Sequence, residues 1–197
     1  MKKVNIESSR VIFNDFFKIV ETYLSYERFD ERMSPVVRRL NFERGDSVAA
    51  IVFNVTSQKV LLVNQFKYPT LEKQPGWIDE VVAGTLEAGE SSEFAVRREI
   101  REEIGYEVNQ LIYVSTFYVS PGGSSERIIL YYAEVDDTGR IADGGGSEDE
   151  GEDIKTVEFS LSEIFDSVSS GRIADAKTII AIMWLKDRCE RKEVCGF

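Results

Sequence analysis

The stretch Gly84–Tyr106 reads GTLEAGESSEFAVRREIREEIGY, and it limits the fold and the chemistry of this 197-residue chain more than any other segment. From Ser91 to Ile104 it contains strong helix formers and no Gly or Pro, which predicts a helix. On that helix Glu99 lies three residues before Glu102 and four before Glu103, so the three carboxylates share a face. Like charges at this spacing repel one another unless a cation lies between them, and a hard divalent metal ion is the natural counter-ion.

The predicted helix has its own start and stop signals. Glu90–Glu93 supplies capping side chains and negative charge at its beginning, and Gly105 is typical of a helix end. Arg98 is expected to pair with Glu90 or with another of these carboxylates, which leaves Glu90 as either the partner of Arg98 or an outer metal ligand. A solvated, Glu-rich surface helix is the simpler alternative, but it does not require glycine at Gly84. The predicted buried face, opposite the carboxylates, consists of Phe94, Val96 and Ile100.

The composition excludes several kinds of active site. There are no histidines, which rules out Ser-His-Asp and Cys-His sites and any His-ligated zinc. Acid–base chemistry must therefore come from carboxylates, Lys, Tyr or water. The formal net charge of −11 argues against binding a nucleic-acid backbone. It does not argue against a small anionic substrate, because a bound metal ion inverts the local field.

Other features of the sequence favour a cytoplasmic protein. No apolar run approaches the ~20 residues that a membrane span needs, and Met1–Glu7 has no apolar stretch typical of a signal peptide. The two cysteines, Cys189 and Cys195, lack the spacing of a zinc site and are expected to be reduced thiols. A hydrophobic content of 43% is enough for one domain, or for one domain with an N-terminal addition.

The hydrophobic patterns predict a mixture of strands and helices. Residues 10–28 alternate apolar and polar with many aromatics, which indicates two antiparallel strands whose apolar face is buried on a partner or on the chain's own domain. Further strands are predicted at 36–42, 48–55, 59–66, 80–86, 111–119, 128–135 and 154–159, and helices at 161–170 and 175–191. Strands that outnumber helices, with a helix between them, predict an α/β (α+β) sandwich with a mixed sheet and flanking helices.

The spacing of Gly84–Tyr106 resembles the Nudix box: Gly, five residues, Glu, seven residues, Arg-Glu-Ile, one residue, Glu-Glu, one residue, Gly and a hydrophobic residue. Tyr106 is the one loose position, since an aliphatic residue is more common there. Other segments are similar to the ADP-ribose pyrophosphatases: 33–45, 120–127, 152–154 and 171–178. The related GDP-mannose pyrophosphatases share the triple glycine Gly144–Gly146 and the acidic run that follows it.

The resemblance implies the Nudix α/β/α sandwich, with residues 1–45 as an N-terminal antiparallel β subdomain and residues 46–197 as the catalytic domain. It implies a homodimer that exchanges the N-terminal subdomain, with no nucleic-acid or membrane partner. The implied reaction is Mg²⁺-dependent hydrolysis of ADP-ribose to AMP and ribose 5-phosphate, with Mn²⁺ as a possible substitute. GDP-mannose or another nucleoside diphosphate sugar is the alternative substrate.

The resemblance also implies a set of metal ligands and a general base. Its metal ligands are the side chains of Glu99, Glu102 and Glu103 and the backbone carbonyl of Ala83. The base is a glutamate outside the box, in the loop before the strand at 154–159. Counting back from that strand gives Glu152 as a further ligand and Glu150 as the base, whereas counting forward from the triple glycine gives Glu148 and Glu150. Glu150 is common to both counts and is the expected base, and Glu152 is the expected ligand.

The substrate contacts that the resemblance implies come from both parts of the chain. Arg39 and Lys67 lie where relatives place basic residues near the diphosphate. Relatives usually have Arg at the second position, and Lys keeps the charge but loses the bidentate fork. Phe16 is expected to stack on the base from the partner subunit. Glu80 and Glu126 are expected to bind ribose or sugar hydroxyls.

Two readings of another kind compete with a sugar-nucleotide hydrolase. A binding or regulatory module that only senses nucleotides is expected to have lost box carboxylates, and none is lost here. Messenger decapping or hydrolysis of nucleoside triphosphates is the other, and the acidic charge and the loop at 120–127 count against it. Pyrophosphate hydrolysis is therefore the expected reaction class.

Overall fold

The computed structural model describes residues 2–147, 149 and 151–194 of the chain. The chain forms two compact units, and each is described by itself. The first contains Met1–Asp46 and Tyr118–Arg127, and the second contains Ser47–Phe117 and Ile128–Phe197. The expected metal ligands therefore all belong to the second unit.

The first unit is built on a three-stranded antiparallel sheet in the order β1-β2-β3. Its strands are β1 (Val4–Asn14), β2 (Lys18–Tyr26) and β3 (Val37–Glu43). Glu21 on the central strand accepts hydrogen bonds from Arg38 Nε at 2.6 Å and Arg10 Nε at 2.7 Å, one from each neighbouring strand. These two bonds hold the pKa of Glu21 below its ordinary value. Ion pairs on both sides of the central strand therefore add to the stability of the three-stranded pairing.

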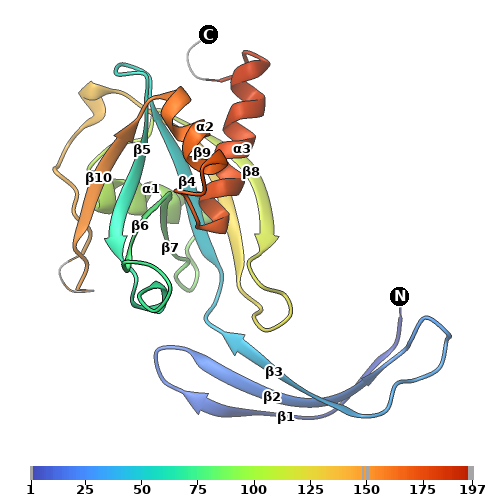
Figure 1. Cartoon of the computed structure of the whole chain (residues 1–197). Helices are drawn as coiled ribbons and strands as arrows, with labels where there is room; N and C mark the ends of the chain where they lie inside the picture. Colours follow the sequence, from blue (N-terminus) through green and yellow to red (C-terminus); the bar gives the residue numbers. More distant parts are fainter. Residues whose placement is uncertain (1, 148, 150, 195–197) are drawn as a thin grey trace. The chain divides into compact units, whose positions relative to one another are not determined.

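The second unit contains a seven-stranded mixed sheet (Figure 1). The main order is β10-β5-β4-β9-β8, in which β4 and β9 are parallel while β4 and β10 are each antiparallel to β5. The two short strands β6 and β7 pair with β5 and β4. The strands are β4 (Ser47–Asn54), β5 (Lys59–Phe66), β6 (Trp77–Glu80), β7 (Val82–Thr85), β8 (Gln110–Tyr118), β9 (Arg127–Val135) and β10 (Ile154–Phe159). Short 3₁₀ turns lie at Tyr68–Thr70 and Asp137–Gly139.

The central sheet forks between β4 and β5, and the candidate site lies in this fork. Only the last part of β4, Val52–Asn54, pairs with β5, whereas its first part pairs with β7. The far end of β5 pairs with β6 instead. The strand predicted at 80–86 contains β7, but β6 was not predicted and ends at Glu80. The two short strands have different partners, because the diverging strands β4 and β5 each need a new hydrogen-bonding partner.

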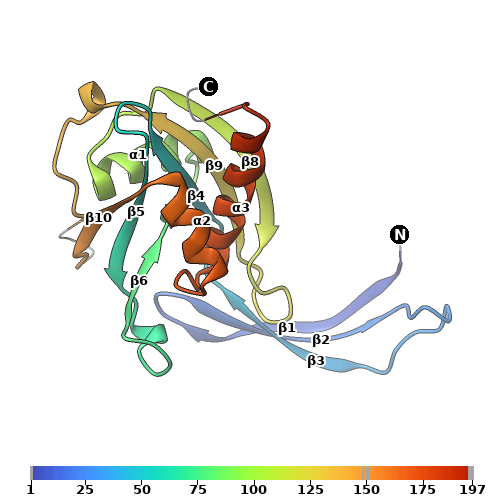
Figure 2. The same ribbon diagram turned by 45° about the horizontal axis from the view of Figure 1, so that its top comes forward.

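Helices cover both faces of this sheet, as Figures 1 and 2 show. Helix α1 (Ser92–Ile104) packs through Val96 and Ile100 on one face. Helices α2 (Leu161–Ser169) and α3 (Ala176–Glu190) pack on the other. All eight residues of β4 are buried, as expected for a strand covered on both faces. The predicted α/β/α sandwich with a mixed sheet and a separate antiparallel sheet is confirmed.

Helix α1 begins and ends where the sequence predicts. The Ser91 hydroxyl accepts a hydrogen bond from the backbone N–H of Phe94 at 3.3 Å, and Gly105 ends the helix in the left-handed conformation with φ of 78°. The predicted burial of Phe94 is wrong, because its side chain is 65% exposed. Glu103 is buried with Ile100 instead, so the carboxylates do not all lie on a solvent-facing side.

Two further expectations from the sequence concern the membrane and the cysteines. None of the helices in the described part of the chain is long and apolar enough to cross a membrane. Cys189 is disulfide-bonded, so the prediction of a reduced thiol is wrong for this residue. Cys195 lies outside the described residues.

Candidate active site

Arg98 holds three of the box carboxylates. Its Nε atom donates to Glu90 at 3.0 Å, and its Nη1 atom donates to Glu99 at 2.9 Å and to Glu102 at 3.0 Å. A second bond from Nη2 to Glu90 makes that contact bidentate and lowers the pKa of Glu90. Glu90 is therefore the partner of Arg98, and the guanidinium group orients the other two carboxylates.

Glu99 is packed against the backbone of β7. A Cβ atom at Gly84 would lie 1.8 Å from Glu99 Oε1, so glycine at this position lets the carboxylate of Glu99 lie directly against the strand. Burial raises the pKa of Glu99 to about 7, although the charge of Arg98 opposes this shift. The first glycine of the box and its central glutamate are thus parts of one contact.

Glu103 is the most deeply buried of the predicted metal ligands. Glu103 is 3% exposed, and its carboxylate accepts a hydrogen bond from the backbone N–H of Ala83 at 3.3 Å. Burial raises its pKa well above the ordinary value, and the neighbouring carboxylates of Glu99, Glu152 and Glu80 raise it further. A buried carboxylate beside three others is costly unless a cation joins them.

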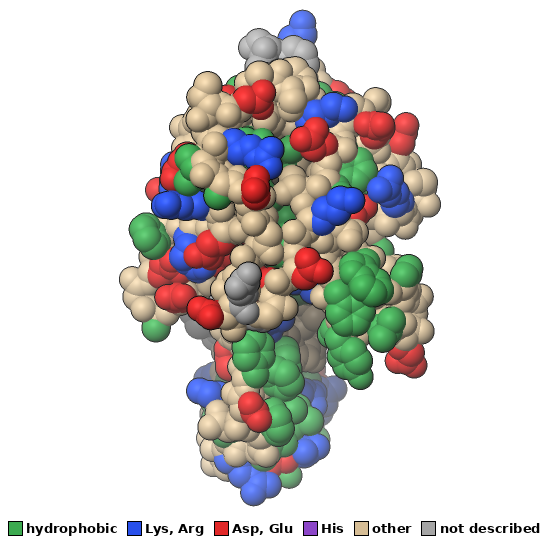
Figure 3. Space-filling model, turned by 90° about the vertical axis from the view of Figure 1, so that its left-hand side faces the viewer, with side chains coloured by type: hydrophobic (Ala, Val, Ile, Leu, Met, Phe, Trp, Pro, Cys, Tyr) green, Lys and Arg blue, Asp and Glu red, His purple; other side chains and the backbone are tan. Residues whose placement is uncertain are grey.

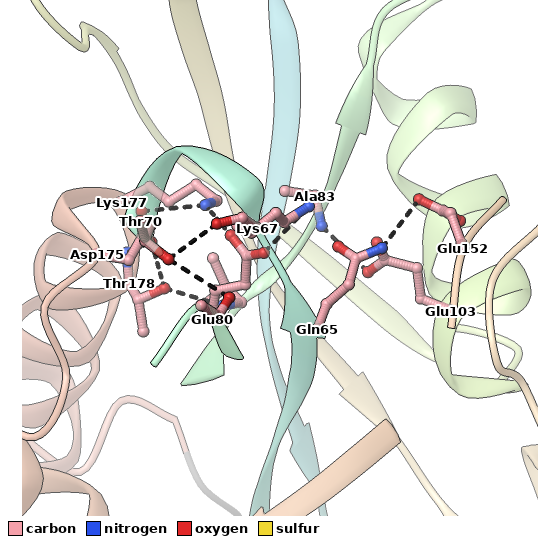
Figure 4. A network of polar contacts seen from close by, with 12 residues as sticks. Gln65, Lys67, Thr70, Glu80, Ala83, Glu103, Glu152, Asp175, Lys177 and Thr178 are labelled. Carbon is pink, nitrogen blue, oxygen red and sulfur yellow. Dashed lines mark hydrogen bonds and ion pairs between the residues drawn. The ribbon is translucent and has the colours of Figure 1, made fainter. Parts of the chain in front are cut away.

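Glu152 reaches this cluster from the loop before β10. Its Oε2 atom accepts a hydrogen bond from the backbone N–H of Ser147 at 3.0 Å, and its Oε1 atom accepts one from Gln65 Nε2 at 3.5 Å. Figure 4 shows Gln65, Glu103 and Glu152 side by side, contributed by β5, α1 and the loop. Residues that are far apart in sequence therefore meet at one end of the fork.

The triple glycine joins this loop to the end of helix α1. The N–H groups of Gly145 and Gly146 donate to the carbonyls of Glu103 and Glu102 at 3.0 and 3.1 Å. These carbonyls lie in the last turn of the helix, where carbonyl groups need partners from outside the helix. A Cβ atom at Gly144 would lie 2.5 Å from the carbonyl oxygen of Glu103. The loop before β10 is thus hydrogen-bonded to the backbone of Glu102 and Glu103, two of the residues whose side chains form the carboxylate group.

Replacing Gly144 by alanine is expected to destabilise the protein much more than replacing Gly171 by alanine. Both glycines have φ of 74°, but a Cβ atom at Gly171 meets nothing within 4 Å. The Gly171→Ala variant is expected to lose about 1 kcal/mol, from the left-handed backbone alone. The Gly144→Ala variant is expected to lose about 3 kcal/mol or more, because its methyl group collides with helix α1. Urea unfolding of both variants measures the difference in the free energy of unfolding. Equal losses would contradict the close contact between the triple glycine and the end of helix α1.

The donor set of the site fits a hard divalent cation. The carboxylates of Glu99, Glu103 and Glu152 repel one another in a buried environment, and Arg98 contacts only the first of them. Carboxylate and carbonyl oxygens are the ligands that Mg²⁺ and Mn²⁺ prefer. Among residues 2–147, 149 and 151–194, no group of three or more acidic or cysteine side chains lies close enough together to hold a metal ion. The backbone of Ala83 lies beside Glu103, where its carbonyl could complete the set.

A second charged cluster lies on the other side of the fork, around Glu80. The carboxylate of Glu80 forms ion pairs with Lys67, at 3.3 Å, and with Lys177 from helix α3. Lys177 also contacts Asp175 at 3.1 Å, and the hydroxyl of Thr178 accepts a hydrogen bond from the backbone N–H of Val81 at 2.9 Å (Figure 4). The structure thus brings Lys67 and Glu80 together, as two expected substrate contacts.

Sequence reasoning missed two side chains of this site. Lys177 follows the helix cap Asp175 and looks like an ordinary first-turn residue, so nothing in the sequence marks it as a partner of Glu80. Gln65 is the last residue but one of the strand at 59–66, and only the pairing of β5 with β10 places it near Glu152. Both contacts depend on the order of strands, which a single sequence does not state.

The other expected site residues lie outside this unit or outside the described residues. Phe16 is 88% exposed at the turn between β1 and β2. Arg39 on β3 is exposed, and Glu126 forms an ion pair with Arg44 at 3.6 Å. Phe16, Arg39 and Glu126 all belong to the first unit. The expected base Glu150 and the alternative ligand Glu148 lie outside the described residues.

Two features together define the Nudix class. One is a mixed sheet between helices, and the other is a helix whose carboxylates are hydrogen-bonded to an arginine and which follows a strand that contains a glycine. The NUDIX domain family matches residues 43–180. The chain therefore belongs to the Nudix family, which confirms the resemblance carried by Gly84–Tyr106.

Similar proteins extend this relationship over almost the whole chain. It is 35% identical over 185 residues to the ADP-ribose pyrophosphatase of Escherichia coli (strain K12), covering 93% of this chain and 88% of that protein. It is 34% identical over 187 residues to the GDP-mannose pyrophosphatase of Cronobacter sakazakii, covering 94% and 96%. A crystal structure of an ADP compounds hydrolase has the same fold, with a TM-score of 0.76, 18% identity and coverage of 98% and 97%.

Proposed function

We propose that this protein hydrolyses the pyrophosphate bond of ADP-ribose to AMP and ribose 5-phosphate with the aid of Mg²⁺. The observation that carries the proposal is the group formed by buried Glu103 and half-buried Glu99 and Glu152, whose mutual repulsion calls for divalent cations. A diphosphate is the substrate chemistry that such cations neutralise and activate. The similarity to pyrophosphatases over 93% of the chain supports the same reaction.

The proposed metal ligands are Glu99, Glu103, Glu152 and the carbonyl of Ala83, with Glu102 as a further ligand. Glu99 and Glu103 approach from α1, and Glu152 approaches from the loop that the triple glycine pins to that helix. Arg98 keeps Glu99 and Glu102 oriented without entering the metal site. Mg²⁺ at this position supplies charge neutralisation of the diphosphate and a more acidic bound water.

The remaining roles in the proposed reaction belong to the base and to the substrate contacts. Glu150 is proposed as the general base that takes the proton from the attacking water. Lys67 is proposed to face the diphosphate, and its ion pair with Glu80 supports a fixed position for its ammonium group. Phe16, Arg39 and Glu126 are proposed to contact the nucleoside and the sugar, as the resemblance implies.

The dimer is proposed from the surface of the N-terminal sheet. Residues 1–45 are proposed as an exchanged subdomain and residues 46–197 as the catalytic domain. The sheet exposes many large hydrophobic side chains, which are green in the lower lobe of Figure 3. On the strands they include Val4, Ile6, Val11, Ile12, Phe13 and Tyr23, and Phe16 and Phe29 are exposed in the turns beside the strands. An apolar surface of this kind is typical of a protein–protein interface, and a second copy of the chain is the proposed partner.

GDP-mannose is the second candidate substrate, because the two named relatives are almost equally similar to this chain. The identity is 34% to the GDP-mannose pyrophosphatase and 35% to the ADP-ribose pyrophosphatase. The triple glycine, which the resemblance associates with the former, has a structural role at the end of α1. A cytoplasmic location, Mg²⁺ as the natural metal and the lack of a nucleic-acid partner stay predictions.

The test is a panel of substrates in the presence of Mg²⁺. ADP-ribose, GDP-mannose, UDP-glucose and nucleoside triphosphates are incubated with the protein, and released monophosphate is measured after adding phosphatase. ADP-ribose is expected to give the highest kcat/KM. A higher value for GDP-mannose would select the second candidate, and no hydrolysis of any diphosphate sugar would overturn both.

A further inference from the structure

Gln65 is a buried polar side chain at the end of an apolar row. On β5 the side chains of Leu61, Val63 and Gln65 point to the same face of the sheet, and the first two are packed in the core with α1. Gln65 is only 7% exposed. A buried amide in such a row is costly unless its donor has a partner. The partner of its Nε2 atom is Glu152 Oε1, at 3.5 Å.

The pairing of the strands explains why this amide reaches Glu152. Gln65 lies directly opposite Ile154, the first residue of β10, and Glu152 precedes that strand by two residues. The other carboxylate oxygen of Glu152 is held by the backbone N–H of Ser147. Each carboxylate oxygen of Glu152 thus accepts one hydrogen bond, and the bond from Gln65 is drawn in Figure 4.

The donor that orients Glu152 is a neutral amide. The amide of Gln65 fixes the direction of the Glu152 carboxylate but leaves its negative charge available to a cation. At Glu90, by contrast, the guanidinium group of Arg98 fixes the carboxylate and also neutralises it. Glu152 is close enough to Glu99 and Glu103 for their charges to interact. The hydrogen bond from Gln65 therefore orients Glu152 without reducing its negative charge.

We propose that Gln65 is a positioning residue that holds Glu152 ready to bind the divalent metal. This inference rests on the proposed function, because it takes Glu152 to be a metal ligand. Loss of the Gln65 amide leaves the loop attached through Ser147 and the triple glycine, but lets the carboxylate rotate away. The effect is therefore expected on metal affinity rather than on folding.

The experiment compares Gln65→Met with Asn64→Leu as a matched control. Both substitutions remove a strand amide that donates to a carboxylate, since Asn64 Nδ2 donates to Asp79 at 2.7 Å. Asn64 is the next residue on β5 and points to the opposite face of the sheet. Binding of Mn²⁺ to the substrate-free protein is measured by electron paramagnetic resonance, and thermal unfolding in EDTA checks that each variant folds.

Gln65→Met is expected to raise the Kd for Mn²⁺ about tenfold, as is usual when a group that orients a metal ligand is lost. Asn64→Leu is expected to bind Mn²⁺ as the wild type does. Adding Gln65→Met to Glu152→Gln is expected to cause no further loss, because the amide acts through that carboxylate. Wild-type Mn²⁺ affinity in Gln65→Met, or an equal loss in Asn64→Leu, would overturn the proposal.

The same measurements separate this inference from the proposed function. Mn²⁺ binding is measured without substrate. If the wild-type protein binds Mn²⁺ but hydrolyses no diphosphate sugar, the proposed reaction is contradicted, and the Kd values for Mn²⁺ still decide the role of Gln65. If Glu152→Gln itself binds Mn²⁺ as the wild type does, the role of Gln65 is overturned, whatever the substrate panel shows.

Discussion

Replacing Glu103 by glutamine is expected to lower kcat about 10³-fold or more and, in the same protein, to stabilise the metal-free fold at pH 8. The loss of activity follows from its proposed role as a metal ligand. The gain in stability follows from its surroundings, because Glu103 is 3% exposed and lies among other carboxylates. A neutral amide of the same shape removes that repulsion, which is expected to add about 2 kcal/mol to the free energy of unfolding.

The sign of this stability effect depends on pH. Burial raises the pKa of Glu99 from its ordinary value of 4.5 to about 7, and it raises the pKa of Glu103 as well. Between those values the unfolded chain has lost the proton while the folded chain retains it, so the metal-free protein loses stability as the pH rises. For Glu99 the loss between pH 4.5 and 7 is on the order of 3 kcal/mol. Below pH 4.5 both states are protonated and this loss is absent.

Urea unfolding in EDTA at pH 5 and pH 8 measures this effect, and the substrate panel gives kcat. The wild type is expected to be less stable at pH 8 than Glu103→Gln and nearly equal to it at pH 5. Saturating Mg²⁺ is expected to stabilise the wild type more than the variant, because the metal binds only the complete site. A variant that keeps wild-type kcat, or that is less stable at pH 8, would contradict the role assigned to Glu103.

Replacing Glu150 by glutamine is expected to lower kcat by about 10²–10⁴-fold while metal affinity is unchanged. The amide keeps the size of the side chain but cannot accept a proton from water. Asp149→Asn is the matched control, since it removes the same charge from the neighbouring exposed position of the loop. It is expected to keep kcat near the wild-type value.

Measuring kcat and Mn²⁺ affinity together separates the glutamates of this loop. Glu150→Gln is expected to affect only kcat, and Glu152→Gln to weaken Mn²⁺ binding as well. If Glu148→Gln weakens Mn²⁺ binding and Glu152→Gln does not, the metal ligand is Glu148. Wild-type turnover in Glu150→Gln would remove that residue from the mechanism.

Much of the fold could be predicted from the sequence because the signals are local. The helix at Ser92–Ile104 is predicted by its capping serine, its helix-forming residues and Gly105. The buried strand at Ser47–Asn54 is a continuous apolar run. The sequence does not separate the short strands β6 and β7. The strand with which each of them pairs depends on the fork between β4 and β5. Local sequence carries no signal for that choice.

The sequence by itself determined the reaction class, since the spacing of Glu99, Glu102 and Glu103 on one helix is a property of consecutive residues. Only the tertiary structure decided what surrounds them. Gly84 lies against Glu99, and Gln65 reaches Glu152, because separate strands and a loop converge at one end of a forked sheet. The physical reason is distance along the chain: helical spacing is set by local geometry, whereas contacts between remote segments are set by strand order and packing.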